Sequence, residues 1–377
     1  MYFISIKKFF FSKYFKIFYA TATIFILLDI IFSNTFVKNI IKKDCLNYTK
    51  YSINGKNYFN YDLLKNCKAY ETKKTVKTYN VFTNEHGFRV SGKNKKKKAN
   101  SVIFLGDSFT YGLGLNYEES IPGQIEKKNT SFEIYNLGIP GYSPLALRFR
   151  LQETLKLGIK PKKIFYLMDL TDVHDESNRW FLLDDHPYPL ILDKKVQEEI
   201  KKVFNFKNNF KMSRLLVYNL NKITRNFRKE INQKKFIEED KIIGKTLWGS
   251  FTHTSFENLD KNFWIKNDYM NGIKNIKLNV KSIAEIARSV NSEFYIVIYP
   301  WAETLQYGED YFSWQNFASE LCKFSNCTKV ISAFPEFEKI KNKYSHWKKE
   351  IYILQDIHLN ENGNKILAEV IYNEAFR

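Results

Sequence analysis

The chain has 377 residues, of which 44% are hydrophobic, enough for one large α/β domain with additions. The formal net charge is +19, but the lysines are spread along the chain, with one dense run at 93–98. This pattern argues against a nucleic-acid partner and predicts a solvated linker at the run, with contact to anionic lipid or polymer as the alternative.

Residues 1–40 predict a cytoplasmic tail followed by an uncleaved transmembrane signal anchor at 17–37. About 20 apolar residues span a bilayer, and this stretch has that length although Asp29 interrupts it. No small-x-small cleavage site occurs at 34–36. The preceding lysines favour a cytoplasmic N-terminus: Lys7, Lys8, Lys13 and Lys16. We therefore expect the body of the protein to be extracytoplasmic, periplasmic or at the cell surface, with the membrane bound through this helix. A buried core helix is the alternative.

The four cysteines fall into two local pairs, Cys45 with Cys67 and Cys322 with Cys327. No Cys-x-x-Cys or Cys/His spacing points to zinc. In an extracytoplasmic chain, local pairs of this kind predict structural disulfides. Four unrelated thiols are the alternative.

Residues 41–99 are polar and are interpreted as an irregular linker or arm. Within it, the compact segment 84–89 ends in Gly-Phe-Arg and predicts a structural brace, with Arg89 reaching toward a sheet.

A buried strand is predicted at 102–105, where four apolar residues follow one another without alternation. Gly106 breaks this strand, and Asp107 and Ser108 follow. A strand that ends in a sharp turn places the next side chains in a crevice at the carboxyl edge of its sheet. Ser108 would lie there with a free hydroxyl and an outward N–H, although both residues are also common helix caps.

The segment 106–112, Gly-Asp-Ser-Phe-Thr-Tyr-Gly, resembles the first block of the SGNH (GDSL-like) hydrolases. Similar Gly-Phe-Arg segments precede this block in some membrane-anchored, extracytoplasmic members. The resemblance implies that Ser108 is the nucleophile and that its N–H is an oxyanion donor, with Asp107 in a supporting position. It runs from about residue 85 to the end, apart from an insertion.

A helix is predicted at 117–128 and a second strand at 132–135. The following Asn-Leu-Gly and Pro-Gly-Tyr-Ser, at 136–143, resemble the second family block. The resemblance implies that Gly138 donates its backbone N–H to the oxyanion, since preorganised N–H donors stabilise that charge and glycine permits a close approach. An ordinary Gly-Pro turn is the alternative.

A helix is predicted at 143–156, with Ser143 as its cap, and a third strand at 163–168. The junction that follows carries Gly-x-Asn-Asp in the family. By alignment Asp172 matches the aspartate, as a supporting residue, and Thr171 takes the place of the asparagine that donates to the oxyanion. A threonine hydroxyl donates one hydrogen bond from a shorter arm, so the resemblance implies an oxyanion site that is weaker or completed differently. Loss of one such donor costs about 100- to 1,000-fold in rate.

An acidic cluster with two histidines follows this strand, without recognised metal-ligand spacing. We therefore predict solvated loop residues and neither a metal ion nor another cofactor; the cluster comprises His174, Asp175, Asp184, Asp185 and His186. Residues 180–266 resemble no family block and are interpreted as an insertion, with helical periodicity at 212–231. Such an insertion is either a lid that shapes substrate access or an addition on the flank of the domain.

The α/β pattern resumes with further elements predicted at 273–289 (helix), 293–299 (strand), 313–322 (helix) and 329–331 (strand). The closing Asp356-Ile357-His358, followed by Asn360 as a cap and an apolar helix, resembles the last family block. The usual spacing there is Asp-x-x-His, and Asp-x-His-x-Asn resembles one subgroup. The resemblance implies that His358 takes the Ser108 proton and that Asp356 orients the imidazole.

Strands that alternate with helices over 100–377 predict a flavodoxin-like, three-layer α/β/α sandwich with a parallel sheet. The resemblance implies a Ser-His-Asp enzyme that hydrolyses an ester or transfers an acetyl or other acyl group. An acylated small molecule or polysaccharide is the expected substrate, with a surface glycan favoured. Because Thr171 replaces the asparagine, a catalytically weakened glycan-binding or scaffold protein is the alternative.

Overall fold

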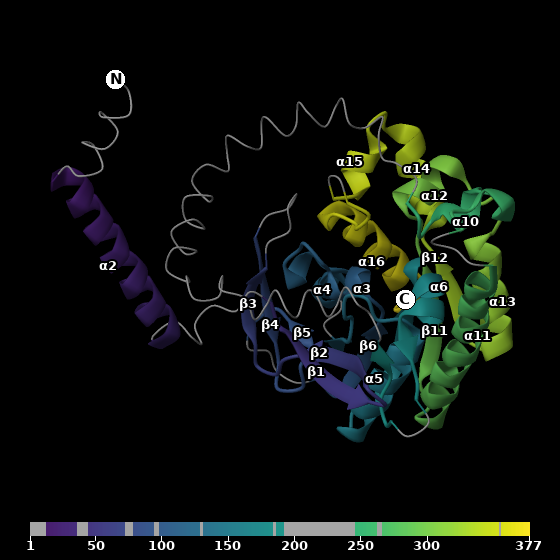
Figure 1. Ribbon diagram of the computed structural model, residues 1–377. Coiled ribbons are helices and arrows are strands. Elements are labelled where there is room, and N and C mark those ends of the chain that lie inside the picture. Colours follow the sequence, from purple (N-terminus) through teal and green to yellow (C-terminus); the bar gives the residue numbers. More distant parts are fainter. Residues whose placement is uncertain are drawn as a thin grey trace. The chain divides into compact units, whose positions relative to one another are not determined.

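The computed structural model describes residues 13–35, 44–71, 78–93, 98–128, 131–183, 186–191, 246–261, 266–353 and 356–377 (Figure 1). The chain divides into two compact units, residues 1–42 with 194–239 and residues 43–193 with 240–377. In the first unit the structure describes one helix, α2 (Lys13–Thr35), which covers most of the predicted anchor. Among the helices of the described part, none has the length and apolar character needed to cross a membrane.

Five parallel strands form the centre of the second unit, in the spatial order β12-β11-β8-β6-β7. They are β6 (Asn100–Leu105), β7 (Phe132–Asn136), β8 (Pro161–Leu167), β11 (Glu293–Ile298) and β12 (Lys329–Ser332). The order is the predicted flavodoxin-like one, with the chain switching direction between β6 and β8. A crevice forms outside the carboxyl ends of the strands at such a switch point.

The chain moves outward from β6 to β7 and back across to β8, and with the right-handed connections usual between parallel strands this order puts helices on both faces of the sheet. On one face α11 packs against α5, α6 and α13, and elsewhere α16 packs against α4. The helices of this unit are α3 (Ser108–Tyr111), α4 (Ile121–Lys128), α5 (Pro144–Lys156), α6 (Thr171–Asn178), α10 (Ser250–His253), α11 (Lys266–Ser289), α12 (Ala302–Tyr307), α13 (Trp314–Ser325), α14 (Phe334–Lys343), α15 (Trp347–Ile351) and α16 (Glu361–Ala375), with short 3-10 turns at Tyr117–Glu119 and Phe256–Asn258.

The described residues 44–71 and 78–93 carry strands, within the stretch 41–99 that the sequence predicts as a linker or arm. Strands β3 (Lys68–Glu71), β4 (Tyr79–Thr83) and β5 (Arg89–Val90) extend the main sheet beyond β7, and each pairs antiparallel with its neighbour. Strands β1 (Leu46–Ile53) and β2 (Lys56–Leu63) form a hairpin, which β9 (Trp180–Phe181) and β10 (Leu190–Ile191) join in a second sheet.

Asn54 and Gly55 form the turn of the β1–β2 hairpin, with φ of 49° and 72°. Positive φ at both central residues matches the right-handed twist of the two strands. The disulfide between Cys45 and Cys67 joins the two ends of this hairpin.

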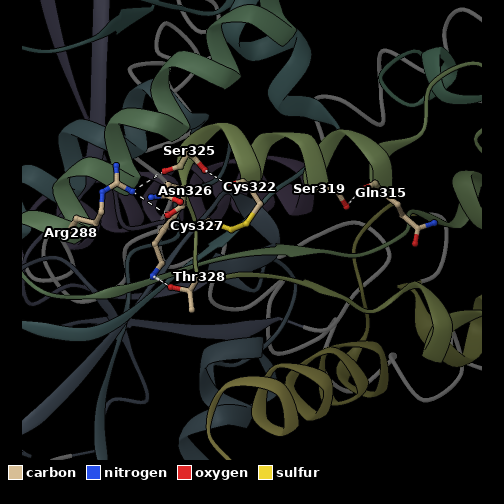
Figure 2. Close-up of a disulfide and its surroundings, with 9 residues drawn as sticks. Arg288, Gln315, Ser319, Cys322, Ser325, Asn326, Cys327 and Thr328 are labelled. Atoms are coloured by element: carbon tan, nitrogen blue, oxygen red, sulfur yellow. Dashed lines mark hydrogen bonds between the residues drawn. A yellow bond between two sulfur atoms is a disulfide. The ribbon is translucent and has the colours of Figure 1, made fainter.

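The second predicted disulfide, Cys322–Cys327, closes the end of α13 (Figure 2). Asn326 ends the helix in the left-handed conformation, with φ of 58°. Arg288 of α11 donates to the carbonyls of Ser325 and Asn326 at 2.9 and 3.2 Å. Both predicted cysteine pairings are thus confirmed, and two disulfides point to an oxidising, extracytoplasmic location.

Parts of the predicted insertion at 180–266 are described: β9 and β10 at its start, and α10 with the turn Phe256–Asn258 near its end. The helix predicted at 212–231 lies outside the described residues, as do Asp184 and Asp185.

Candidate active site

Ser108 is the first residue of α3, directly after the turn that ends β6. Gly106 makes this turn with φ of 157°, and an added Cβ would lie 2.1 Å from Thr110 Oγ1. Asp107 caps α3 by accepting from the N–H of Phe109 at 2.9 Å. Within the described residues the Ser108 N–H has no acceptor, so it is available at the helix N-terminus. Asp107 therefore caps the helix, and Ser108 remains accessible at its N-terminus.

Arg89 holds the turn that follows α3 from the neighbouring edge of the sheet. Its fully buried guanidinium donates to the carbonyls of Tyr111, Gly112 and Leu115, the second over 2.8 Å. It also lies 4.4 Å from the centroid of the Tyr111 ring. These contacts agree with the predicted brace, because they fix the backbone on the C-terminal side of Ser108.

His358 reaches Ser108 from the far end of the chain. Its Nε2 lies 2.7 Å from Ser108 Oγ, and its Nδ1 hydrogen-bonds Asp356 Oδ1. The same Asp356 oxygen accepts from the backbone N–H of His358 at 3.1 Å. The imidazole packs on the Phe109 ring, with centroids 4.7 Å apart. The structure thus brings the three predicted catalytic side chains into one hydrogen-bonded series.

A tight loop between α15 and α16 makes the short Asp-x-His spacing workable. The N–H of Ile353 donates to the His358 carbonyl at 2.8 Å, which closes the loop across Asp356. Asn360 caps α16 by accepting from the N–H of Gly363 at 2.9 Å. An added Cβ on Gly363 would lie 2.3 Å from the Ile351 carbonyl, so this glycine lets α16 start close beneath the loop.

Gly138 is not free to act as the predicted oxyanion donor in this structure. Its N–H donates to Asn136 Oδ1 at 2.9 Å, in a local turn that satisfies a buried amide. The Asn136 amide donates in turn to the Thr110 carbonyl at 2.9 Å. An added Cβ on Gly138 would lie 2.3 Å from the Tyr111 nitrogen, so glycine is required here for close packing against α3.

The Thr171 hydroxyl is also occupied, by a residue that sequence reasoning missed. Its Oγ1 and N–H donate to Asp169 Oδ1 at 2.7 and 2.9 Å. The other oxygen of Asp169 accepts from the Tyr299 hydroxyl at 2.9 Å and the Trp301 indole at 2.8 Å. In this structure the Thr171 hydroxyl, which was predicted to donate to an oxyanion, donates to Asp169 instead. The signal was present in the sequence, because Asp169 stands where the family has glycine.

Three buried carboxyl groups lie behind the site: Asp107, Asp169 and Asp172. Burial, reinforced by the charge of Asp169, raises the pKa of Asp107 and of Asp172 well above the ordinary aspartate value. Asp172 Oδ2 accepts from the Tyr166 hydroxyl at 2.6 Å and the Asp169 N–H at 3.0 Å, so it orders the junction. Asp107 Oδ2 lies 3.3 Å from Ser108 Oγ.

The described members of the predicted acidic cluster have local partners. His174 Nδ1 lies 3.1 Å from Asp175 Oδ1, and the His186 ring packs edge-on against Tyr51 at 4.5 Å. Where the structure describes the chain, no three His, Cys, Asp or Glu side chains are grouped so that they could hold a metal ion.

No protein-family model matches the chain, and no curated protein matches it. Among solved structures it is similar to a putative lipolytic protein of the G-D-S-L family from Desulfitobacterium hafniense, with 13% identity over 73% of this chain and 98% of that one and a TM-score of 0.38. A catalytic mutant of an acetylxylan esterase from Geobacillus stearothermophilus gives 11% identity, 74% and 96% coverage and a TM-score of 0.38. A member of the lipolytic G-D-S-L family from Veillonella parvula is 12% identical over 74% of this chain and 100% of that one, with a TM-score of 0.39. Low identity of this order leaves the chemistry to be inferred from the side chains of this chain.

Proposed function

We propose that this protein is a serine-dependent esterase of the SGNH type, which hydrolyses an ester or transfers its acyl group to another hydroxyl. The observation that carries the proposal is the series Ser108 Oγ, His358 Nε2 and Nδ1, and Asp356 Oδ1. Nucleophilic acyl transfer needs a nucleophile within hydrogen-bond reach of a base, and a third group that orients the base.

In the proposed mechanism, His358 Nε2 takes the proton from Ser108 Oγ as this oxygen attacks the ester carbonyl. His358 then gives the proton to the departing alkoxide, which leaves as an alcohol, and the acyl group stays on Ser108 as an acyl-serine. Water, or a sugar hydroxyl in the transferase version, loses a proton to His358 and attacks the acyl-serine. The bond to Ser108 Oγ then breaks, His358 returns the proton to that oxygen, and the free acid or the new ester leaves. Asp356 holds the Nδ1–H and stabilises the imidazolium at both stages.

The tetrahedral intermediate carries a negative oxygen that needs N–H donors. We propose the Ser108 N–H as the first donor, because it lies at the N-terminus of α3 without an acceptor in the described residues. An oxyanion is a stronger acceptor than an amide oxygen, so the Gly138 N–H would exchange Asn136 Oδ1 for the oxyanion. Thr171 is not assigned a role, because Asp169 takes its hydroxyl.

The proposed substrate is an acyl ester, with acetyl as the favoured group, on an extracytoplasmic polysaccharide or smaller glycan. The two disulfides support an oxidising compartment for the folded domain. Attachment to a membrane through residues 17–37 stays a prediction of the sequence.

A specific observation favours a second candidate, a glycan-binding or scaffold protein on the same fold. Two of the three predicted oxyanion donors, the Gly138 N–H and the Thr171 hydroxyl, already have acceptors within the protein. A protein with an intact triad but too few donors would bind an ester without turning it over at a useful rate.

Turnover of p-nitrophenyl acetate and covalent labelling by a fluorophosphonate distinguish the two candidates. The wild-type protein is expected to show both, and Ser108→Ala to lose both. Ser319→Ala, an exposed serine of α13, is the matched control and should keep both. Labelling that persists in Ser108→Ala contradicts the proposed nucleophile. A wild-type protein that neither reacts nor turns over, yet binds polysaccharide, selects the second candidate.

A further inference from the structure

A cavity of about 560 Å³ lies between α5, α6 and α11, beside β2 and β9, outside the triad. Its lining includes Tyr58, Arg148, Glu176, Trp180, Asn275 and Asn279. Helix α6 joins the two sites, since Thr171 begins it beside Asp169 and Glu176 comes five residues later. At 1.5 Å per residue, these two positions are about 7.5 Å apart along the helix axis.

Arg148 contributes a cation that makes no ion pair with another described side chain. It is half-buried, and within the described residues its guanidinium makes no hydrogen bond or ion pair. The guanidinium carbon lies 5.0 Å from the centroid of the neighbouring Phe149 ring. Burial lowers the pKa of Arg148, and the charge of Glu176 opposes this effect. A partly desolvated cation of this kind is stabilised by an anion that enters the cavity.

Glu176 acts on Arg148 through its charge, but its two carboxylate oxygens accept hydrogen bonds from other groups. One oxygen accepts from Ser143 Oγ and the Leu145 N–H, both at 2.6 Å, and the other accepts from Asn279 Nδ2 at 2.7 Å. The carboxylate is buried, and it lies outside ion-pair distance of Arg148. A ligand in the cavity therefore meets the Arg148 guanidinium of α5, whereas the Glu176 carboxylate of α6 is buried and hydrogen-bonded.

Two amides of α11 present acceptors to the same cavity. Asn275 and Asn279 are one turn apart on one helix face, and both donate Nδ2 to Glu176, at 2.9 Å to its carbonyl and 2.7 Å to its carboxylate. With Nδ2 fixed, the Oδ1 atom of each amide has no donor in the described part of the chain. Asn279 is only 8% exposed and lines the cavity, so a hydroxyl of a bound ligand would meet its Oδ1 there.

Aromatic rings complete the lining. Trp180 is only 3% exposed, because its indole N–H donates to the Gly141 carbonyl at 2.9 Å and its ring packs 5.0 Å from that of Tyr142, so the half-buried Phe181 ring beside it offers the apolar surface. Tyr58 of β2 lines the cavity as well. Apolar ring surface, hydroxyl acceptors and one unpaired guanidinium together suit a sugar that carries a carboxylate.

We propose that this cavity binds a carboxylate-bearing sugar unit of a polysaccharide. The inference rests on the proposed function in one respect: the bound unit belongs to the glycan whose acyl ester reaches Ser108. Arg148 pairs with the sugar carboxylate through two parallel N–H donors, and the Asn275 and Asn279 oxygens accept from sugar hydroxyls. The cavity volume falls in the range of about 300–1,000 Å³ that small-molecule sites occupy.

Isothermal titration of the whole protein with trigalacturonate and with neutral galactotriose tests the inference. Trigalacturonate is expected to bind at least about tenfold more tightly, as a charge-assisted pair requires. Arg148→Gln should remove this preference. Lys274→Gln is the matched control, because it deletes an exposed positive charge of α11 that does not line the cavity, and it should keep the preference. Thermal melting of each variant verifies that it is folded.

Equal affinity for the two sugars, absence of binding by either, or a preference that survives Arg148→Gln would overturn the inference. A preference that Lys274→Gln also removes would overturn it too, because it would reflect the general positive charge of the chain. Since titration needs no turnover, a protein inactive on p-nitrophenyl acetate that still shows the Arg148-dependent preference would contradict the proposed esterase and uphold the sugar site.

Discussion

The indole N–H of Trp301 donates to one oxygen of Asp169 over 2.8 Å, while the Thr171 hydroxyl donates to the other over 2.7 Å. Asp169 follows β8 and Trp301 follows β11, so one buried carboxylate ties together the loops of two adjacent parallel strands. The Phe109 ring that supports His358 stacks at 6.2 Å on the same Trp301. Asp169 therefore orders the crevice and at the same time withdraws Thr171 from it.

Asp169→Ala is expected to destabilise the fold. It leaves the buried Tyr299 hydroxyl and Trp301 indole without an acceptor, at about 1–3 kcal/mol for each orphaned group. Asp169→Asn should cost less, because its amide oxygen still accepts from both rings. Urea unfolding of the two variants measures the difference. Equal losses would show that the ring contacts do not account for the effect.

Thr171→Val is expected to slow turnover of p-nitrophenyl acetate by less than about tenfold. Loss of an oxyanion donor would cost about 100- to 1,000-fold, but this hydroxyl donates to Asp169. Thr171→Ser, which keeps a hydroxyl, is the control for the change of shape. If Thr171→Val, but not Thr171→Ser, slowed turnover by about 100-fold or more, the Thr171 hydroxyl would have to be assigned as an oxyanion donor.

The central sheet and the series of Ser108, His358 and Asp356 could be predicted from the sequence because their signals are local. Buried parallel strands appear as unbroken apolar runs, as in 102–105, and a glycine marks the turn after a strand. The loop residues then converge because parallel strands end at one edge of the sheet. For His358, the resemblance of 356–360 to the last SGNH block, just before a capped final helix and in a chain with the other blocks, carried the prediction.

The strands of 46–90 and the occupied donors could not be predicted in the same way. Strand β2, Lys-Asn-Tyr-Phe-Asn-Tyr-Asp-Leu, has many polar residues, so its alternation of buried and exposed side chains is hard to recognise in the sequence. The Asn54-Gly55 pair is the local signal that indicates a hairpin turn there. Which acceptor a hydrogen-bond donor meets depends on the folded structure. The sequence shows that Gly138 and Thr171 are near the site, but not that Asn136 and Asp169 claim their donors.

Asp356→Asn is expected to slow turnover of p-nitrophenyl acetate by about 1,000- to 10,000-fold, because an amide favours the wrong imidazole tautomer of His358. Asp310→Asn, an exposed aspartate, is the matched control and should leave turnover unchanged. Circular dichroism verifies that both variants are folded. A drop below tenfold in Asp356→Asn would remove Asp356 from the triad.

Loss of the Cys45–Cys67 bridge should destabilise the protein more than loss of Cys322–Cys327. The first closes a separation of 22 residues and the second one of 5, which corresponds to about 3 and about 2 kcal/mol of loop-closure entropy. Arg288 also holds the end of α13 independently of the second bridge. Urea unfolding of the two paired Cys→Ala variants compares them, and the reverse order would contradict the prediction.

Asp172→Asn should make stability less dependent on pH. Burial raises the pKa of Asp172 above its unfolded value of about 3.9, so the folded state holds the proton more tightly. Its contribution to stability is therefore fully present below about pH 4 and is lost as pH rises through the folded pKa. Asparagine does not titrate, yet its oxygen can still accept from Tyr166 and the Asp169 N–H.

Thermal melting across this pH range checks the contribution of Asp172. We expect the melting temperature of the wild type to fall as pH rises above about 4 and that of Asp172→Asn to fall less steeply. Asp107, whose pKa is raised for the same reason, supplies the slope that remains. Identical slopes in the two proteins would mean that Asp172 ionises in the folded state no later than in the unfolded chain.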